Sequence, residues 1–116
     1  MKEVSKQIEH NGKTYKIVFN LNVMEAIQEE YKTLDNWGAL TDGQSGETNI
    51  KALLFGFREM LNEGIEITNE ETGSNEPLLS KKQVGRILTE IGIENATNKV
   101  NDLVIESAGE DNSKNA

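Results

Sequence analysis

The chain has 116 residues, enough for a single domain, and carries a net charge of −8. This charge argues against binding to nucleic acid or to an anionic membrane surface, since both attract Lys and Arg. The absence of cysteine excludes disulfides, thiolate catalysis and cysteine metal sites. No apolar leader stands at the N-terminus, and the longest apolar stretch, residues 52–55, is too short to cross a bilayer. We therefore expect a soluble cytoplasmic protein.

Two strands, residues 4–10 and 13–19, are predicted around the dipeptide Asn11-Gly12. A type I′ turn needs positive φ at both central residues, which Asn and Gly tolerate. A two-residue turn then sets the cross-strand pairs His10–Lys13, Ile8–Tyr15, Lys6–Ile17 and Val4–Phe19. One face of this hairpin is apolar and the other polar, so we expect the apolar face to pack against helices.

The next two predicted helices are short. The first runs to about Lys32 and is capped by Asn20 or by Asn22, the latter with Glu25 in a capping-box arrangement. Thr33 is expected to cap the second, residues 34–40, which carries the single tryptophan. Residues 41–48 are polar and contain glycine, which predicts a loop.

Asn49 is expected to cap the most apolar helix, which runs from Ile50 to about Glu63 and ends at Gly64. Its predicted buried stripe comprises Ile50, Leu53, Leu54, Phe57, Met60 and Leu61. A short strand over residues 65–67 and a mobile acidic loop reaching Glu76 are predicted to follow, because this stretch is rich in Glu and lacks Lys and Arg.

Ser80 and Gln83 form a predicted capping box for a helix that ends at Gly92. Asn95 is expected to cap a final helix to about Ser107, and residues 109–116 offer nothing to bury. The predicted fold class is therefore α+β and mostly helical: a hairpin and four to five amphipathic helices in one domain (residues 1–108), followed by a disordered tail (109–116).

No residue pattern predicts catalysis, a cofactor or a metal. His10 is the only histidine, which rules out His-based metal sites and Ser-His-Asp arrangements, and its place at the hairpin rim predicts a surface role. The acidic stretch lacks the spacing of a calcium loop, and neither a phosphate-binding nor a dinucleotide-binding glycine pattern is present. We expect a protein that binds other proteins and is not an enzyme.

Two aromatic side chains are candidates for partner binding. Trp37 lies in a short helix beside the loop at 41–48, and Phe55 falls outside the apolar stripe of its helix. Tryptophan is enriched at binding hot spots, whereas large aromatic residues are usually buried. Both readings, exposed anchors and cover for a thin core, remain open at this point.

Three segments resemble the tail assembly chaperones encoded by long-tailed bacteriophages and prophages of Gram-positive bacteria. The first is a strand leading into Phe-Asn-Leu-Asn (19–22) and a helix reading Met-Glu-x-Ile-Gln-Glu-x-Tyr (24–31). An apolar helix ending in Asn-Glu-Gly (62–64) and the capped segment Pro-Leu-Leu-Ser-Lys-Lys-Gln-Val-Gly-Arg-Ile (77–87) agree with it. The likeness covers roughly residues 4–105 and includes no invariant chemical motif.

The resemblance implies a factor made in the host bacterial cytoplasm and absent from the mature virion. Such a chaperone coats the tape measure protein, recruits tail tube protein and forms oligomers along its client. Many members also exist in a longer form made by a programmed frameshift. Ser113-Lys114-Asn115 can be encoded by TCA-AAA-AAC, which contains the slippery heptamer A-AAA-AAC, so such a form is a hypothesis here.

Two other functions fit the composition. The chain would suit an acidic phage regulator that mimics nucleic acid and occupies a basic cleft of a host protein, although its carboxylates follow no regular spacing. It would also suit a minor structural tail protein, which incorporation into virions would reveal. An enzyme ranks last, because the fold alone would have to assemble an acid–base pair from scattered carboxylates.

Overall fold

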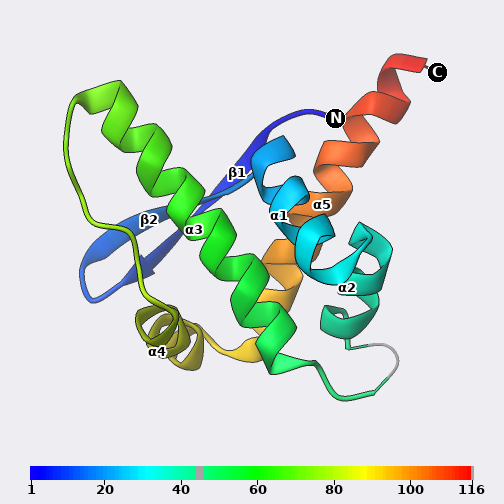
Figure 1. Cartoon of the computed structure of the whole chain (residues 1–116), viewed down its shortest axis with the longest axis horizontal. Helices are drawn as coiled ribbons and strands as arrows, with labels where there is room; N and C mark the ends of the chain where they lie inside the picture. Colours follow the sequence, from blue (N-terminus) through cyan, green and yellow to red (C-terminus); the bar gives the residue numbers. More distant parts are fainter. Residues whose placement is uncertain (44–45, 116) are drawn as a thin grey trace.

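The computed structural model describes residues 1–43 and 46–115, with side chains described as far as Ala108. Within these residues an N-terminal hairpin is followed by five helices, which confirms the predicted α+β, mostly helical fold (Figure 1). The elements are β1 (Val4–His10), β2 (Lys13–Phe19), α1 (Leu21–Tyr31), α2 (Leu34–Thr41), α3 (Ile50–Thr72), α4 (Lys81–Ile91) and α5 (Ile93–Asn115).

The hairpin has the predicted register. His10 pairs with Lys13 and Val4 with Phe19, and the turn residues Asn11 and Gly12 both have positive φ, 53° and 75°. A type I′ turn requires this geometry, so the local Asn-Gly signal sets the whole ladder.

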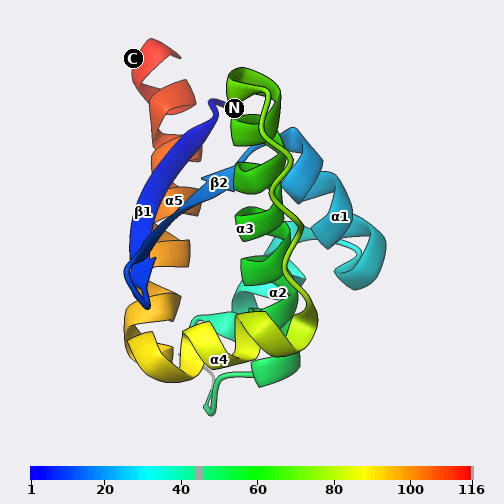
Figure 2. The ribbon, with the colours of Figure 1, turned by 90° about the vertical axis from the view of Figure 1, so that its left-hand side faces the viewer.

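The hairpin lies between two long helices, with β2 along α3 and β1 along α5 (Figure 2). Its apolar face joins the central core, which the helices complete. The α4 helix lies near the hairpin turn, whereas the C-terminus lies at the opposite end of the molecule (Figures 1 and 2). The fully buried side chains at the centre include Ile17, Phe19, Ile27, Trp37, Leu53, Phe57, Met60, Leu61, Val84 and Leu103.

Most helix starts follow their predicted caps. Thr33, Asn49 and Ser80 each accept a hydrogen bond from a backbone N–H three residues later, and Gln83 completes the capping box. Of the two candidates for α1, Asn20 is the cap. The amide of Asn22 instead donates to Glu63 Oε2 on α3, at 2.9 Å.

The predicted end of α3 is wrong. The helix passes through Gly64 and continues to Thr72, where Gly73 closes it with a left-handed φ of 71°. The expected strand at 65–67 and the first part of the expected acidic loop are therefore helical. Glu is a good helix former, which favours the continuation of α3. Gly64 allows α3 to pack closely on β2, because a Cβ there would clash with the backbone oxygen of Lys16.

The chain returns from α3 to α4 in an extended segment held by two asparagines of α3. Asn62 accepts a hydrogen bond from Leu79 N (2.8 Å) and donates one to Leu79 O (3.2 Å). Asn69, seven residues later on the same helix, likewise accepts a hydrogen bond from Glu76 N and donates one to Glu76 O, at 3.0 Å each. The segment preceding α4 is thus tied to α3 through its backbone.

The start of the last helix also differs from prediction. Helix α5 begins at Ile93, immediately after Gly92, and Asn95 donates to Ile91 O and does not cap it. Its backbone continues as helix to Asn115, beyond the predicted end near Ser107. The side chains of 109–115, residue 116 and loop residues 44–45 lie outside the described part, so the predicted tail stays a prediction.

Candidate functional site

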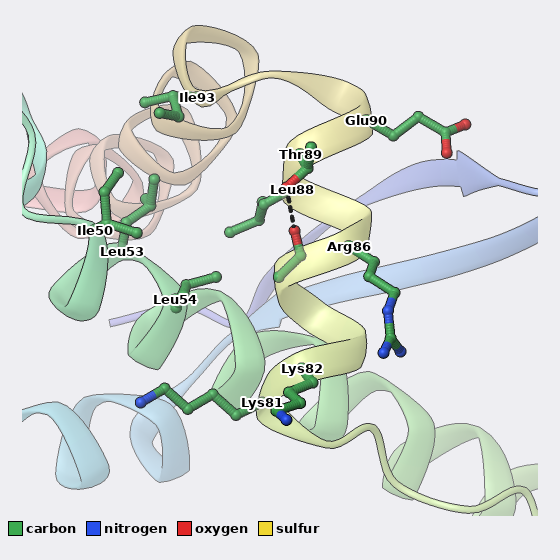
Figure 3. Close-up of a pocket in the computed structure, with 11 residues that line it drawn as sticks. Ile50, Leu53, Leu54, Lys81, Lys82, Arg86, Leu88, Thr89, Glu90 and Ile93 are labelled. Carbon is green, nitrogen blue, oxygen red and sulfur yellow. Dashed lines mark hydrogen bonds between the residues drawn. The ribbon is translucent and has the colours of Figure 1, made fainter.

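An open apolar groove lies between the first turns of α3 and the length of α4 (Figure 3). Its volume is about 1240 Å³, above the roughly 300–1,000 Å³ typical of small-molecule sites. Leu53 and Leu88 form its buried floor, and Leu54 lies half-buried beside them. The size and the lining suit a segment of polypeptide better than a metabolite.

Two isoleucines on the walls of the groove are exposed. Ile50 at the start of α3 is 44% exposed, although its place in the apolar stripe predicted burial, and Ile93 at the start of α5 is 48% exposed. On the α4 side, two of the residues that line the groove are small: Gly85 and Thr89. Because these two side chains cannot reach across, they leave the apolar ends of α3 and α5 uncovered.

Three cations lie along the α4 edge of the groove: Lys81, Lys82 and Arg86. Figure 3 shows Lys81 reaching toward the α3 side, whereas Arg86 and Glu90 extend from the opposite side of α4. Among the described residues none of the three cations has an ion-pair partner, while Glu90 lies 2.9 Å from His10. A protein of net charge −8 therefore carries a locally basic edge at its most apolar opening.

A smaller hollow continues the groove toward α1 and shares Leu54 and Lys81 with it. There Phe55 packs edge-on against Tyr31, with ring centroids 5.6 Å apart. Burial, with a smaller contribution from Glu30, raises the pKa of Tyr31 above 10.0, so its phenol remains neutral at physiological pH. Phe55 is half-buried and beside the groove, and its role in partner binding stays a prediction.

Trp37 is not an exposed anchor. It is 1% exposed, and its indole N–H donates to Ala52 O at 2.8 Å. The ring lies against Gly56 of α3, where a Cβ would clash with it. Of the two readings of Trp37, the exposed anchor is therefore wrong, and the ring covers the core against α3.

The rest of the described structure offers little for chemistry. No group of three or more His, Asp or Glu side chains among these residues is placed to hold a metal ion. His10 is at the hairpin rim, as predicted, but its side chain is only 12% exposed and lies 2.9 Å from Glu90 Oε2. None of the helices in the described part is both long enough and apolar enough to span a membrane.

Several groove residues were not predicted from the sequence, although one sequence signal could have indicated them. The stretch from Lys81 to Arg86 places three cations in six residues of an acidic chain, with a glycine in the middle of an otherwise well-capped helix. The exposure of Ile50 and Ile93 carried no local signal, because it depends on which element covers them.

Comparison of the chain with protein-family models, curated proteins and solved structures gives no match in any of the three. The groove and the residues that line it are therefore the features of the molecule that bear on its function.

Proposed function

We propose that this protein is a phage tail assembly chaperone that binds the tape measure protein without chemistry of its own. It holds apolar helical segments of that client in the α3–α4 groove and brings tail tube protein to it. The protein acts in the cytoplasm of the host bacterium and is not retained in the virion.

The open groove is the observation that supports this proposal most strongly. An amphipathic helix binds by inserting apolar side chains, spaced three and four residues apart, into a groove of this kind. The half-buried Leu54 and the exposed Ile50 and Ile93 offer the matching apolar surface, above a floor of the buried Leu53 and Leu88. Covering these side chains removes apolar area from water on both partners, which favours association.

An acidic regulator that occupies a basic cleft is the second candidate. The outer half of α3 favours it, because Glu66, Glu70 and Glu71 are exposed there. A regulator of this kind would bind its partner through the acidic end of α3 and not through the groove. Substitutions in the groove should therefore weaken the chaperone activity and leave the regulator activity unchanged.

Co-expression with the tape measure protein from the same phage genome tests the proposal. We expect the chaperone to raise the soluble fraction of the client severalfold, and we expect the double variant Ile50→Gln/Ile93→Gln to lose most of that gain. Leu21→Gln is the matched control, since Leu21 is also the first residue of a helix and is 68% exposed, but it lies outside the groove.

No gain in client solubility from the unsubstituted protein would overturn the assignment. Full rescue by the double variant would leave the chaperone activity standing but remove it from the groove. Circular dichroism of the double variant and of Leu21→Gln checks that each one folds.

A further inference from the structure

Gly85 is the least expected residue of α4. It lies in the middle of the helix, half-buried, and a Cβ added there would meet no heavy atom within 4 Å. A glycine inside a helix costs about 1 kcal/mol relative to alanine. The other glycines inside long helices, Gly56 and Gly64, are each filled by a neighbouring part of the chain, whereas Gly85 faces the open groove.

The exposed face of α4 has a consistent chemistry. Lys82, Gly85, Arg86 and Thr89 follow one another at steps of three, one and three, so they share the side opposite the buried Val84, Ile87 and Leu88. The Thr89 hydroxyl donates to Gly85 O at 2.7 Å, so it has a partner within its own helix (Figure 3). This face of α4 therefore has only small side chains at Gly85 and Thr89, and it carries the cations Lys82 and Arg86.

We propose, building on the proposed function, that the groove selects an amphipathic α-helix whose apolar face is flanked by Asp and Glu, and that this helix crosses α4 at Gly85. The glycine allows the two helix axes to approach toward the short end of the usual range of about 8–10 Å. The apolar face of the helix covers Leu54, Ile50 and Ile93. Its carboxylates meet Lys82 and Arg86 on α4 and Lys81 at the end of the groove.

Charge complementarity decides in favour of an acidic partner. The whole protein repels acidic polypeptides, yet the edge of the apolar groove holds three cations without ion-pair partners in the described structure. The single carboxylate of the lining, Glu90, extends from the same side of α4 as Arg86 and lies 2.9 Å from His10 of the hairpin (Figure 3). Complementary charge at a rim steers encounter and selects among apolar partners that would otherwise bind alike.

Two synthetic helical peptides of about four turns test the proposal. They share one apolar leucine face and differ only in the flanking residues, Glu in one and Lys in the other. Fluorescence anisotropy should show the Glu peptide binding about tenfold more tightly, as expected from three partly exposed charge pairs. The triple variant Lys81→Glu/Lys82→Glu/Arg86→Glu should reverse this preference.

Gly85→Leu provides a test that does not depend on charge. The added Cβ meets no heavy atom within 4 Å, so we expect the variant to fold with undiminished stability, while its affinity for the Glu peptide should fall at least tenfold. Gly38→Ala in α2 is the matched control, because Gly38 also has no atom within 4 Å of an added Cβ but does not line the groove. Its affinity should equal that of the unsubstituted protein.

Equal affinity for the two peptides, or unchanged binding by Gly85→Leu, would overturn the inference. Self-association that Gly85→Leu abolishes would assign the groove to a second copy and would overturn it too. These outcomes differ from a failure of the proposed function: selective peptide binding without rescue of tape measure protein refutes the chaperone role alone. Rescue of that client by Gly85→Leu refutes the groove chemistry alone.

Discussion

Two regions along α3 differ in what occupies the space beside a helical glycine. Along its second half, α3 packs directly on β2, and Gly64 has no side chain because the backbone of Lys16 occupies that space. Beside its first half, α4 carries Gly85, and nothing occupies the equivalent space. The first region is closed within the chain. In the second region Gly85 also leaves room for a close neighbour, but no element of this chain fills that room. We therefore interpret this region as a docking surface.

The largest expected effect belongs to the closed region. Gly64→Ala should lower the free energy of unfolding by about 3 kcal/mol, because the new methyl group must displace backbone and not a flexible side chain. Urea denaturation measures the change. A loss below about 1 kcal/mol would mean that α3 and β2 separate easily, and the contrast with Gly85 would lose its basis.

Asn62 ties the two regions together, since it joins α3 to the residue that precedes the α4 cap. Asn62→Ala removes both hydrogen bonds to Leu79 and leaves a partly buried backbone N–H and C=O without these partners. We expect a loss of about 2 kcal/mol in urea denaturation, with faster amide exchange in α4. Asn69→Ala, which removes the exposed hydrogen bonds to Glu76, should cost less than half as much.

The open region should respond in the opposite direction. Gly85→Ala should raise the free energy of unfolding by about 0.8 kcal/mol, since alanine is the better helix former and no atom resists its methyl group. Thermal denaturation should show a higher midpoint, and Gly38→Ala should give a gain of similar size. A loss of stability in Gly85→Ala would show that the groove is closed in solution.

The contrast between the two regions also explains which parts of the fold can be predicted from the sequence. The hairpin register and the caps at Thr33, Asn49 and Ser80 follow from signals within a few residues, and the structure has all of them. The length of α3 does not follow in this way. Gly64 carries the local signal of a helix end, and only the approach of β2 from a distant part of the chain makes it an interior residue.

The sequence left the burial of Trp37 open and predicted that of Ile50 wrongly, and both outcomes have the same physical reason. Trp37 is buried because Gly56 makes room for its ring, a contact between elements that local periodicity does not contain. Ile50 continues an apolar stripe but extends past the element that would have covered it. Periodicity predicts which residues share a face, and tertiary packing decides how much of that face is buried.

The smallest expected effect concerns Glu59, on the side of α3 that leads from Phe55 to Glu63. Burial raises the pKa of Glu59 above 4.5, Glu66 and Glu63 raise it further, and Arg58 opposes them. The folded state therefore holds this proton to a higher pH than the unfolded state does, so ionised Glu59 opposes folding at neutral pH. Because the carboxylate remains largely in contact with water, we expect Glu59→Gln to stabilise the protein at pH 7 by only about 0.3 kcal/mol.

The pH dependence distinguishes this effect from a simple change in packing. Well below pH 4.5 the carboxyl group is protonated in both states, so the advantage of Glu59→Gln should fall as the pH drops toward 4.5 and disappear below it, and it should be complete only above the raised pKa. Urea denaturation of both proteins between pH 4 and pH 7 measures the difference. A constant difference across this range would mean that Glu59 acts through packing and not through its charge, and this side of α3 would then belong with the closed region.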